Sequence, residues 1–232
     1  MVPRTADGSH AIPRLRPIRD GYEPSKIAPP DHPTKRDRMH VDHERKMAFV
    51  HIPKTGGTSV LRALFGEDLD ADHGWTGNAK VRSHLRFCFV RNPVERFRSA
   101  FAYSLMMVEN RPQVTVHKHP IRQMIHDGEL SDSINDFVSV LPDLGEEWLF
   151  RNLHFRPQIR WVERTRPQFI GRFESLQTDF ELLCRFAGVP PTKLGRHRSS
   201  RKRKVDQLTP ESIEIVERVY RDDVALLGYA GR

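Results

Sequence analysis

The segment from 53 to 59 reads Pro-Lys-Thr-Gly-Gly-Thr-Ser and gathers the side-chain types that bind phosphate groups. Adjacent glycines before a helix let successive backbone amides converge on one anion. Lys54 adds a mobile positive charge, and Thr55, Thr58 and Ser59 add hydroxyl donors. We therefore predict that this segment binds a phosphate or a similar anion. The competing interpretation is a tight turn whose glycines serve only its geometry.

The order of residues in this segment differs from that of a Walker A loop. Lys54 precedes both glycines, Gly56 and Gly57, whereas the Walker A lysine follows the last glycine. A kinase would also need an aspartate for magnesium after a buried strand, and the sequence offers no clear candidate. A kinase-like phosphate-loop enzyme is therefore a distant second interpretation.

A second basic segment runs from Arg91 to Ser99. Arg91 ends an apolar stretch, and Ser99 follows eight residues later on a predicted helix. Arg96 and Ser99 are three residues apart and share a helix face. We predict that Arg91 and Ser99, with Arg96 as a further candidate, surround one phosphate. The alternative is a basic helix face in solvent.

Together, the two segments resemble the sulfotransferase superfamily, particularly its carbohydrate sulfotransferase branch, from about Met47 to the C-terminus. Three later stretches fit the same resemblance: residues 154–158, 170–174 and 219–229. The resemblance implies that 3′-phosphoadenosine 5′-phosphosulfate (PAPS) is the donor and that a carbohydrate hydroxyl accepts the sulfuryl group. The product would be adenosine 3′,5′-bisphosphate (PAP), with no metal required. It assigns these residues to the phosphosulfate: Lys54, Thr55, Gly56, Gly57, Thr58 and Ser59. It assigns Arg91 and Ser99 to the 3′-phosphate.

A basic run at 196–204 corresponds in position to the family's late nucleotide-covering loop. Ser199, Ser200 and Arg201 are candidate phosphate contacts there. The run is short and lacks the aromatic residue often found in that loop, so a mobile charged surface loop is an equal alternative.

The proposed chemistry needs a cation at the leaving phosphate and a base at the attacking hydroxyl. Lys54 is the candidate cation. His73 is the first candidate base, because members of the resembling family place a histidine near this position, ahead of the second strand. His154 is the rival candidate and could instead hold the acceptor.

The pattern of apolar residues predicts how these segments are positioned. Short buried strands are predicted at 47–52, 86–90 and 168–173, each followed by an amphipathic helix. Further helices are predicted from Ser131 to Pro142 and from Thr209 to about Leu227. This alternation predicts an α/β, P-loop-like three-layer fold with a central, mostly parallel sheet flanked by helices. Trp148, Phe155 and Trp161 either stack on a sugar or pack in the core.

The composition limits the kinds of ligand that the chain is expected to bind. The chain has 232 residues and a formal net charge of +8, which favours an anionic ligand. Polyanion binding without catalysis is the non-enzymatic alternative, but no aromatic residues interrupt the 196–204 run, so we do not expect nucleic acid as a partner. Residues 1–46 hold seven of 17 prolines and are predicted to be an extended or disordered arm, with the catalytic domain at 47–232.

Two further features bear on the cellular setting. Cys88 and Cys184 lie in apolar stretches and are predicted to be buried thiols. No apolar run reaches the roughly 18 residues of a membrane span. We therefore expect a cytoplasmic protein without an integral membrane segment.

Overall fold

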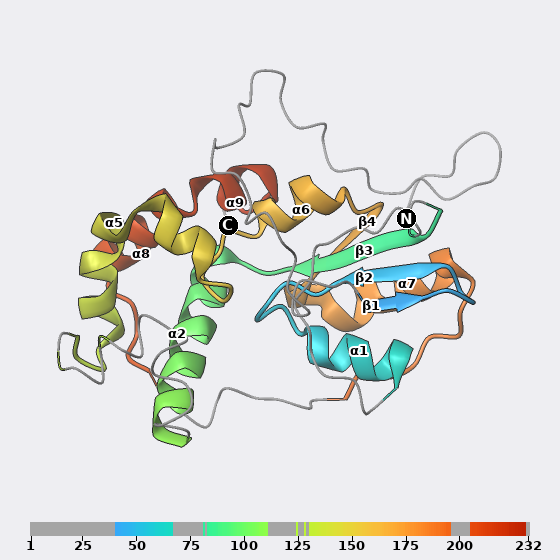
Figure 1. Ribbon diagram of the computed structural model, residues 1–232, viewed down its shortest axis with the longest axis horizontal. Helices are drawn as coiled ribbons and strands as arrows, with labels where there is room; N and C mark the ends of the chain where they lie inside the picture. Colours follow the sequence, from blue (N-terminus) through green and yellow to red (C-terminus); the bar gives the residue numbers. More distant parts are fainter. Residues whose placement is uncertain are drawn as a thin grey trace.

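The computed structural model describes residues 40–66, 81, 83–110, 124, 128, 130–195 and 205–230. Within them lies a four-stranded sheet of order β1-β2-β3-β4 (Figure 1). The strands are β1 (His40–Asp42), β2 (Met47–Val50), β3 (Leu85–Val90) and β4 (Phe169–Arg172). Strands β2, β3 and β4 are parallel, and β1 is an antiparallel edge strand on β2. The predicted mostly parallel sheet is confirmed.

The two faces of the sheet carry alternating side chains because successive residues of a strand point to opposite sides. Phe49 and Phe87 pack on α1 (Gly57–Phe65) and α7 (Leu176–Ala187). Ala48 and Cys88 face the other way, toward α6 (Ile159–Thr165) and the chain after α9 (Arg221–Leu226). Figure 1 shows α1 and α7 on one side of the sheet and α6 and α9 on the other. The three-layer prediction is therefore confirmed.

A separate group of helices packs beside the sheet. It consists of α2 (Pro93–Asn110), α5 (Ile134–Arg151) and α8 (Pro210–Val219), which share an aromatic core around Phe97 and Phe137 (Figure 1). Phe155 is 3% exposed in this core, and Trp148 packs against it. Trp161 is fully buried in the core under α6. All three aromatic residues thus pack in the core rather than forming an open sugar platform.

Some predicted helix ends are wrong. The cap of α5 is Ser133, whose hydroxyl accepts from the Asp136 amide, while Ser131 donates to the Asp136 carboxylate. The helix runs past Pro142 and breaks at Gly145, whose φ of 73° is favourable only for glycine. Thr209 caps α8 as predicted, but that helix ends at Val219, and α9 follows as a separate helix.

The folded domain begins earlier than Met47. Strand β1 pairs its His40 with Phe49 of β2, so residues 40–42 belong to the sheet, and 43–46 form the turn that joins the two strands. A charged three-residue edge strand has too little apolar pattern for sequence reasoning to find. Cys88 and Cys184 are buried free thiols, as predicted. Among the described helices, none is long and apolar enough to cross a bilayer.

Candidate active site

The loop between β2 and α1 folds tightly over its own backbone. Thr55 is fully buried, and its hydroxyl donates to the Ile52 carbonyl at 2.9 Å. Lys54 and Gly56 both have positive φ, 69° and 83°, so the chain reverses its curvature twice before α1 begins. The Thr55 hydroxyl therefore donates within the loop. The groups that can bind an anion here are the backbone amides of the loop and the side chains at its rim.

The two glycines are required by packing. A Cβ at Gly57 would lie 2.0 Å from the His51 ring, and a Cβ at Gly56 would lie 2.7 Å from Leu176. His51 itself is stacked on Phe49 of the sheet, with ring centroids 5.4 Å apart. Sequence reasoning did not single out His51, which supports the loop from beneath.

The first turn of α1 carries Thr58 and Ser59. Both side chains are half-buried. The Ser59 hydroxyl donates to the Gly195 carbonyl at 2.6 Å, which joins α1 to the chain after α7. Thr58 lies beside Ser59 at the start of α1.

Arg91 leaves the carboxyl end of β3 and reaches the loop. Its guanidinium stacks on Phe173 with 4.3 Å from Cζ to the ring centroid, and Nη1 donates to the Lys54 carbonyl at 3.4 Å. Burial lowers the pKa of Arg91, and the nearby Glu95 and Glu174 carboxylates oppose this shift. Arg91 and the glycine loop, predicted separately, therefore share one site.

The Arg91 backbone is fixed from behind by Gln158. The Gln158 side chain accepts from the Arg91 amide at 2.9 Å and donates to the Arg91 carbonyl at 2.8 Å. Asp223 in turn accepts from the amides of Gln158 and Ile159, both at 2.8 Å, at the start of α6. Burial raises the pKa of Asp223, and Arg96 opposes that rise. Only the tertiary fold brings these residues together, so local sequence patterns could not predict the network.

Arg96 is buried and bound to main-chain carbonyls, which corrects the expectation that it could bind a phosphate together with Arg91. It is 1% exposed, and its Nε donates to the Pro53 carbonyl at 3.0 Å. Its Nη2 donates to the carbonyls of His154 and Arg156 at 3.2 and 2.9 Å. The guanidinium points inward because three carbonyls and the attraction of Asp223 offset the cost of burying it. Ser99, three residues later, is half-buried on α2.

Lys54 and His154 both contact Tyr103 of α2. The Lys54 ammonium lies 4.2 Å from the centre of the Tyr103 ring, and the His154 ring is 4.8 Å from it. The structure therefore brings one predicted cation and one predicted base to the same place. Tyr103 was not recognised from the sequence, since a lone tyrosine on an apolar helix reads as a core residue.

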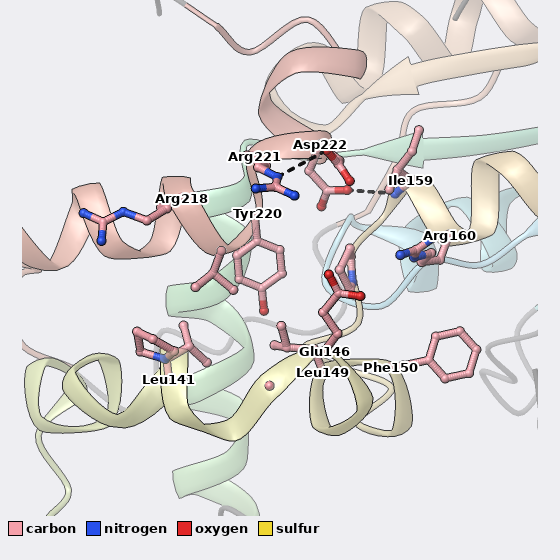
Figure 2. A pocket seen from close by; sticks show the side chains of 15 residues that line it. Leu141, Glu146, Leu149, Phe150, Ile159, Arg160, Arg218, Tyr220, Arg221 and Asp222 are labelled. Carbon is pink, nitrogen blue, oxygen red and sulfur yellow. Dashed lines mark hydrogen bonds and ion pairs between the residues drawn. The ribbon is translucent and has the colours of Figure 1, made fainter. Parts of the chain in front are cut away.

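A cavity of about 210 Å³ lies elsewhere, where α5, α6, α8 and α9 meet (Figure 2). None of its lining residues belongs to the glycine loop or to α2. Within it the Tyr220 hydroxyl donates to the Phe155 carbonyl, and Asp223 is occupied by α6. Figure 2 shows the ion pair of Arg221 and Asp222 at its rim. The cavity is thus separate from the cluster around Lys54.

Four predicted site residues lie outside the described residues: His73, Ser199, Ser200 and Arg201. Their assignments stay predictions.

Comparison with known proteins agrees with this geometry. A family model described as "Sulfotransferase family" matches residues 37–230. The chain belongs to the sulfotransferase family. It is 25% identical to carbohydrate sulfotransferase 10 of Danio rerio over 83% of the chain and 66% of that protein. It is 24% identical to carbohydrate sulfotransferase 10 of Xenopus laevis, over 83% of the chain and 67% of that protein. This sulfotransferase thus spans about two thirds of the length of the curated relatives it matches. The search of solved structures gave no significant match.

Proposed function

We propose that this sulfotransferase transfers a sulfuryl group from PAPS to a hydroxyl of a carbohydrate and releases PAP. The observation that carries the proposal is the contact between Arg91 and the Lys54 carbonyl at 3.4 Å. This contact places the Arg91 guanidinium, which is suited to the 3′-phosphate, next to the glycine loop, which is suited to the 5′-phosphosulfate. The carbohydrate acceptor is supported by the names of the two relatives.

The reaction divides among the residues of the site. The acceptor oxygen attacks sulfur while the bond from sulfur to the phosphate oxygen breaks, so negative charge grows on the departing phosphate. Lys54 and the loop amides stabilise that charge, because fixed donors in a water-poor site need no reorganisation as the charge develops. The acceptor proton passes to a base, for which we propose His154, since its ring shares Tyr103 with Lys54.

Ligand-dependent stability tests the donor. A ligand that binds only the folded state stabilises it by about 2.7 kcal/mol at a hundredfold excess over Kd. We expect PAP to raise the melting temperature of the full chain, with much smaller shifts for ATP and GTP. Equal shifts for all three nucleotides, or none for PAP, would argue against a PAPS enzyme.

The acceptor and the base are tested by transfer itself. With radiolabelled PAPS and a panel of glycans, label should appear in at least one carbohydrate. His154→Asn should abolish most of this transfer without changing the affinity for PAP, because the proposed role of the histidine is to take the acceptor proton and not to bind the donor. Full activity in His154→Asn and its loss in His73→Asn would reassign the base to His73.

A further inference from the structure

One carboxylate lies between two arginines at the start of α2. Glu95 Oε2 is 3.7 Å from Arg91 Nη2, and Glu95 Oε1 is 3.1 Å from Arg98 Nη1. The Glu95 side chain is 50% exposed, whereas those of Arg91 and Arg98 are 16% and 23% exposed. The acid is therefore the outer member of the group, and the two guanidiniums line the inner side.

The two arginines have more donors than this carboxylate can use. The Nε atoms of Arg91 and Arg98 are both buried and have no hydrogen-bond partner among the described residues. Such donors are usually paired in a complete site. The positive charges of Arg96 and Arg98 also help to lower the pKa of Arg91, after its burial. The group is thus short of negative charge and of acceptors.

Ser99 extends the same group by one helical turn. It follows Glu95 by four residues, a spacing that places the two on one face of α2. An anion at the position of the Glu95 carboxylate would therefore lie near Arg91, Arg98 and Ser99 together.

We propose that Arg98 is a further ligand of the donor's 3′-phosphate, and that Glu95 occupies the place of this phosphate until the donor binds. The inference rests on the proposed function, since it assumes a PAPS donor at Arg91. Sequence reasoning assigned no role to Arg98 or to Glu95.

The exchange of Glu95 for phosphate is favourable on simple electrostatic grounds. Glu95 is half exposed and one of its two ion pairs is long, 3.7 Å, so water screens its attraction to the arginines. A phosphate brings more negative charge and three acceptor oxygens, which can bond two guanidiniums at once. Glu95 needs only to turn toward solvent. An adenine nucleotide without a 3′-phosphate gives no such replacement, so Glu95 would stay in place.

Calorimetric titration of the full chain with PAP and with adenosine 5′-monophosphate (AMP) separates this site from the rest of the donor. Arg98→Leu should weaken PAP binding about tenfold, as expected for loss of one charge-assisted hydrogen bond, and leave AMP binding within about twofold. Arg98→Lys, which keeps the positive charge, should weaken PAP binding less than Arg98→Leu does. Glu95→Gln should tighten PAP binding about threefold because the competing anion is gone. The matched control is Arg151→Leu, an exposed α5 arginine paired with Glu147, which should change neither affinity.

The possible failures are distinguishable. If the wild-type chain binds PAP no better than AMP, the proposed function fails, and the role of Arg98 fails with it. If the wild type prefers PAP but Arg98→Leu keeps that preference, only the role of Arg98 is wrong. Weaker PAP binding by Glu95→Gln would show that Glu95 orients Arg91 and does not compete with phosphate.

Discussion

Lys54 and Arg96 are both cations near the glycine loop, and they differ in how deeply they are buried. Lys54 is half-buried and rests on Tyr103, so its ammonium can approach a ligand. Arg96 is 1% exposed, and its N–H groups donate to main-chain carbonyls. One residue is therefore available for chemistry, and the other maintains the shape of the site.

Replacing Lys54 tests the chemical task. Lys54→Ala should lower kcat about 10²- to 10³-fold, comparable with the loss of one donor from an oxyanion hole. The binding of PAP should weaken much less. Lys193→Ala, at an exposed position in the chain after α7, is the matched control and should keep full activity. Near wild-type turnover in Lys54→Ala would remove Lys54 from the mechanism.

Replacing Arg96 tests the structural task. Arg96→Met should reduce the free energy of unfolding by about 3–5 kcal/mol, because buried Asp223 loses the attraction of the guanidinium and three carbonyls lose their donor. Urea unfolding measures this loss. Arg185→Met on the exposed side of α7 should stay within about 0.5 kcal/mol of wild type. A stable Arg96→Met chain would mean that the three carbonyls find other donors.

At the scale of elements, the turn from β2 to α1 depends on close approach between the loop and the segment after β4. Gly56 has a φ of 83°, and its α-carbon faces Leu176 and Phe173. Phe173 is also the ring on which Arg91 stacks. The Phe173 side chain therefore supports both the glycine loop and Arg91.

A pair of glycine substitutions separates backbone strain from crowding. Gly188 also lies in the left-handed region, with φ 68° and ψ 25°, but no atom lies within 4 Å of the place that a Cβ would take there. Gly188→Ala should therefore cost about 1–2 kcal/mol of stability from strain alone. Gly56→Ala should cost about 1–3 kcal/mol more, because the methyl group overpacks Leu176. If thermal or urea unfolding shows equal losses of stability in the two variants, crowding at Gly56 has no effect.

The start of β3 meets the hairpin of β1 and β2 through a histidine pair. His84 is 6% exposed, and its Nε2 lies 3.1 Å from Nδ1 of His43. Burial lowers the pKa of His84 below its ordinary 6.5, the charges of His43 and Lys46 lower it further, and Asp42 opposes the shift. The unfolded chain therefore takes up a proton at this residue more readily than the folded chain does.

Stability should consequently fall as the pH drops below about 6.5 and through the lowered pKa. Melting temperatures between pH 7.5 and 5 measure this fall. His84→Gln should flatten the profile in that window, whereas His43→Gln, which keeps the buried His84, should flatten it less. An unchanged profile in His84→Gln would assign the pH dependence to other groups.

At the scale of the whole molecule, the net charge of +8 favours the approach of a multiply charged donor. Raising NaCl from 50 to 500 mM shortens the distance over which charges act to a few ångströms. The affinity for PAP should therefore fall about tenfold, in line with a contact of several charges. Adenosine, which carries no phosphate, is the control and should bind equally at both salt concentrations. If the affinity for PAP does not change with salt, binding of the two phosphates by charge attraction is contradicted.

The sequence predicted the parts of the molecule whose information is local. The three parallel strands, the glycine turn and the capped start of α8 each depend on neighbouring residues, and all were located. Gln158 and Asp223 could not be paired, because they are 65 residues apart and meet only when α6 and α9 pack together. The inward turn of Arg96 was missed for the same reason, since helix spacing gives its face but not the carbonyls that it meets.

The Arg96 contacts have a consequence for sequence change around the site. Its three partners are peptide oxygens, which every amino acid carries. The side chain at 154 can therefore be replaced while the anchor between the two loops survives. Evolution or design can thus alter the chemistry at this position without rebuilding the backbone beside the glycine loop.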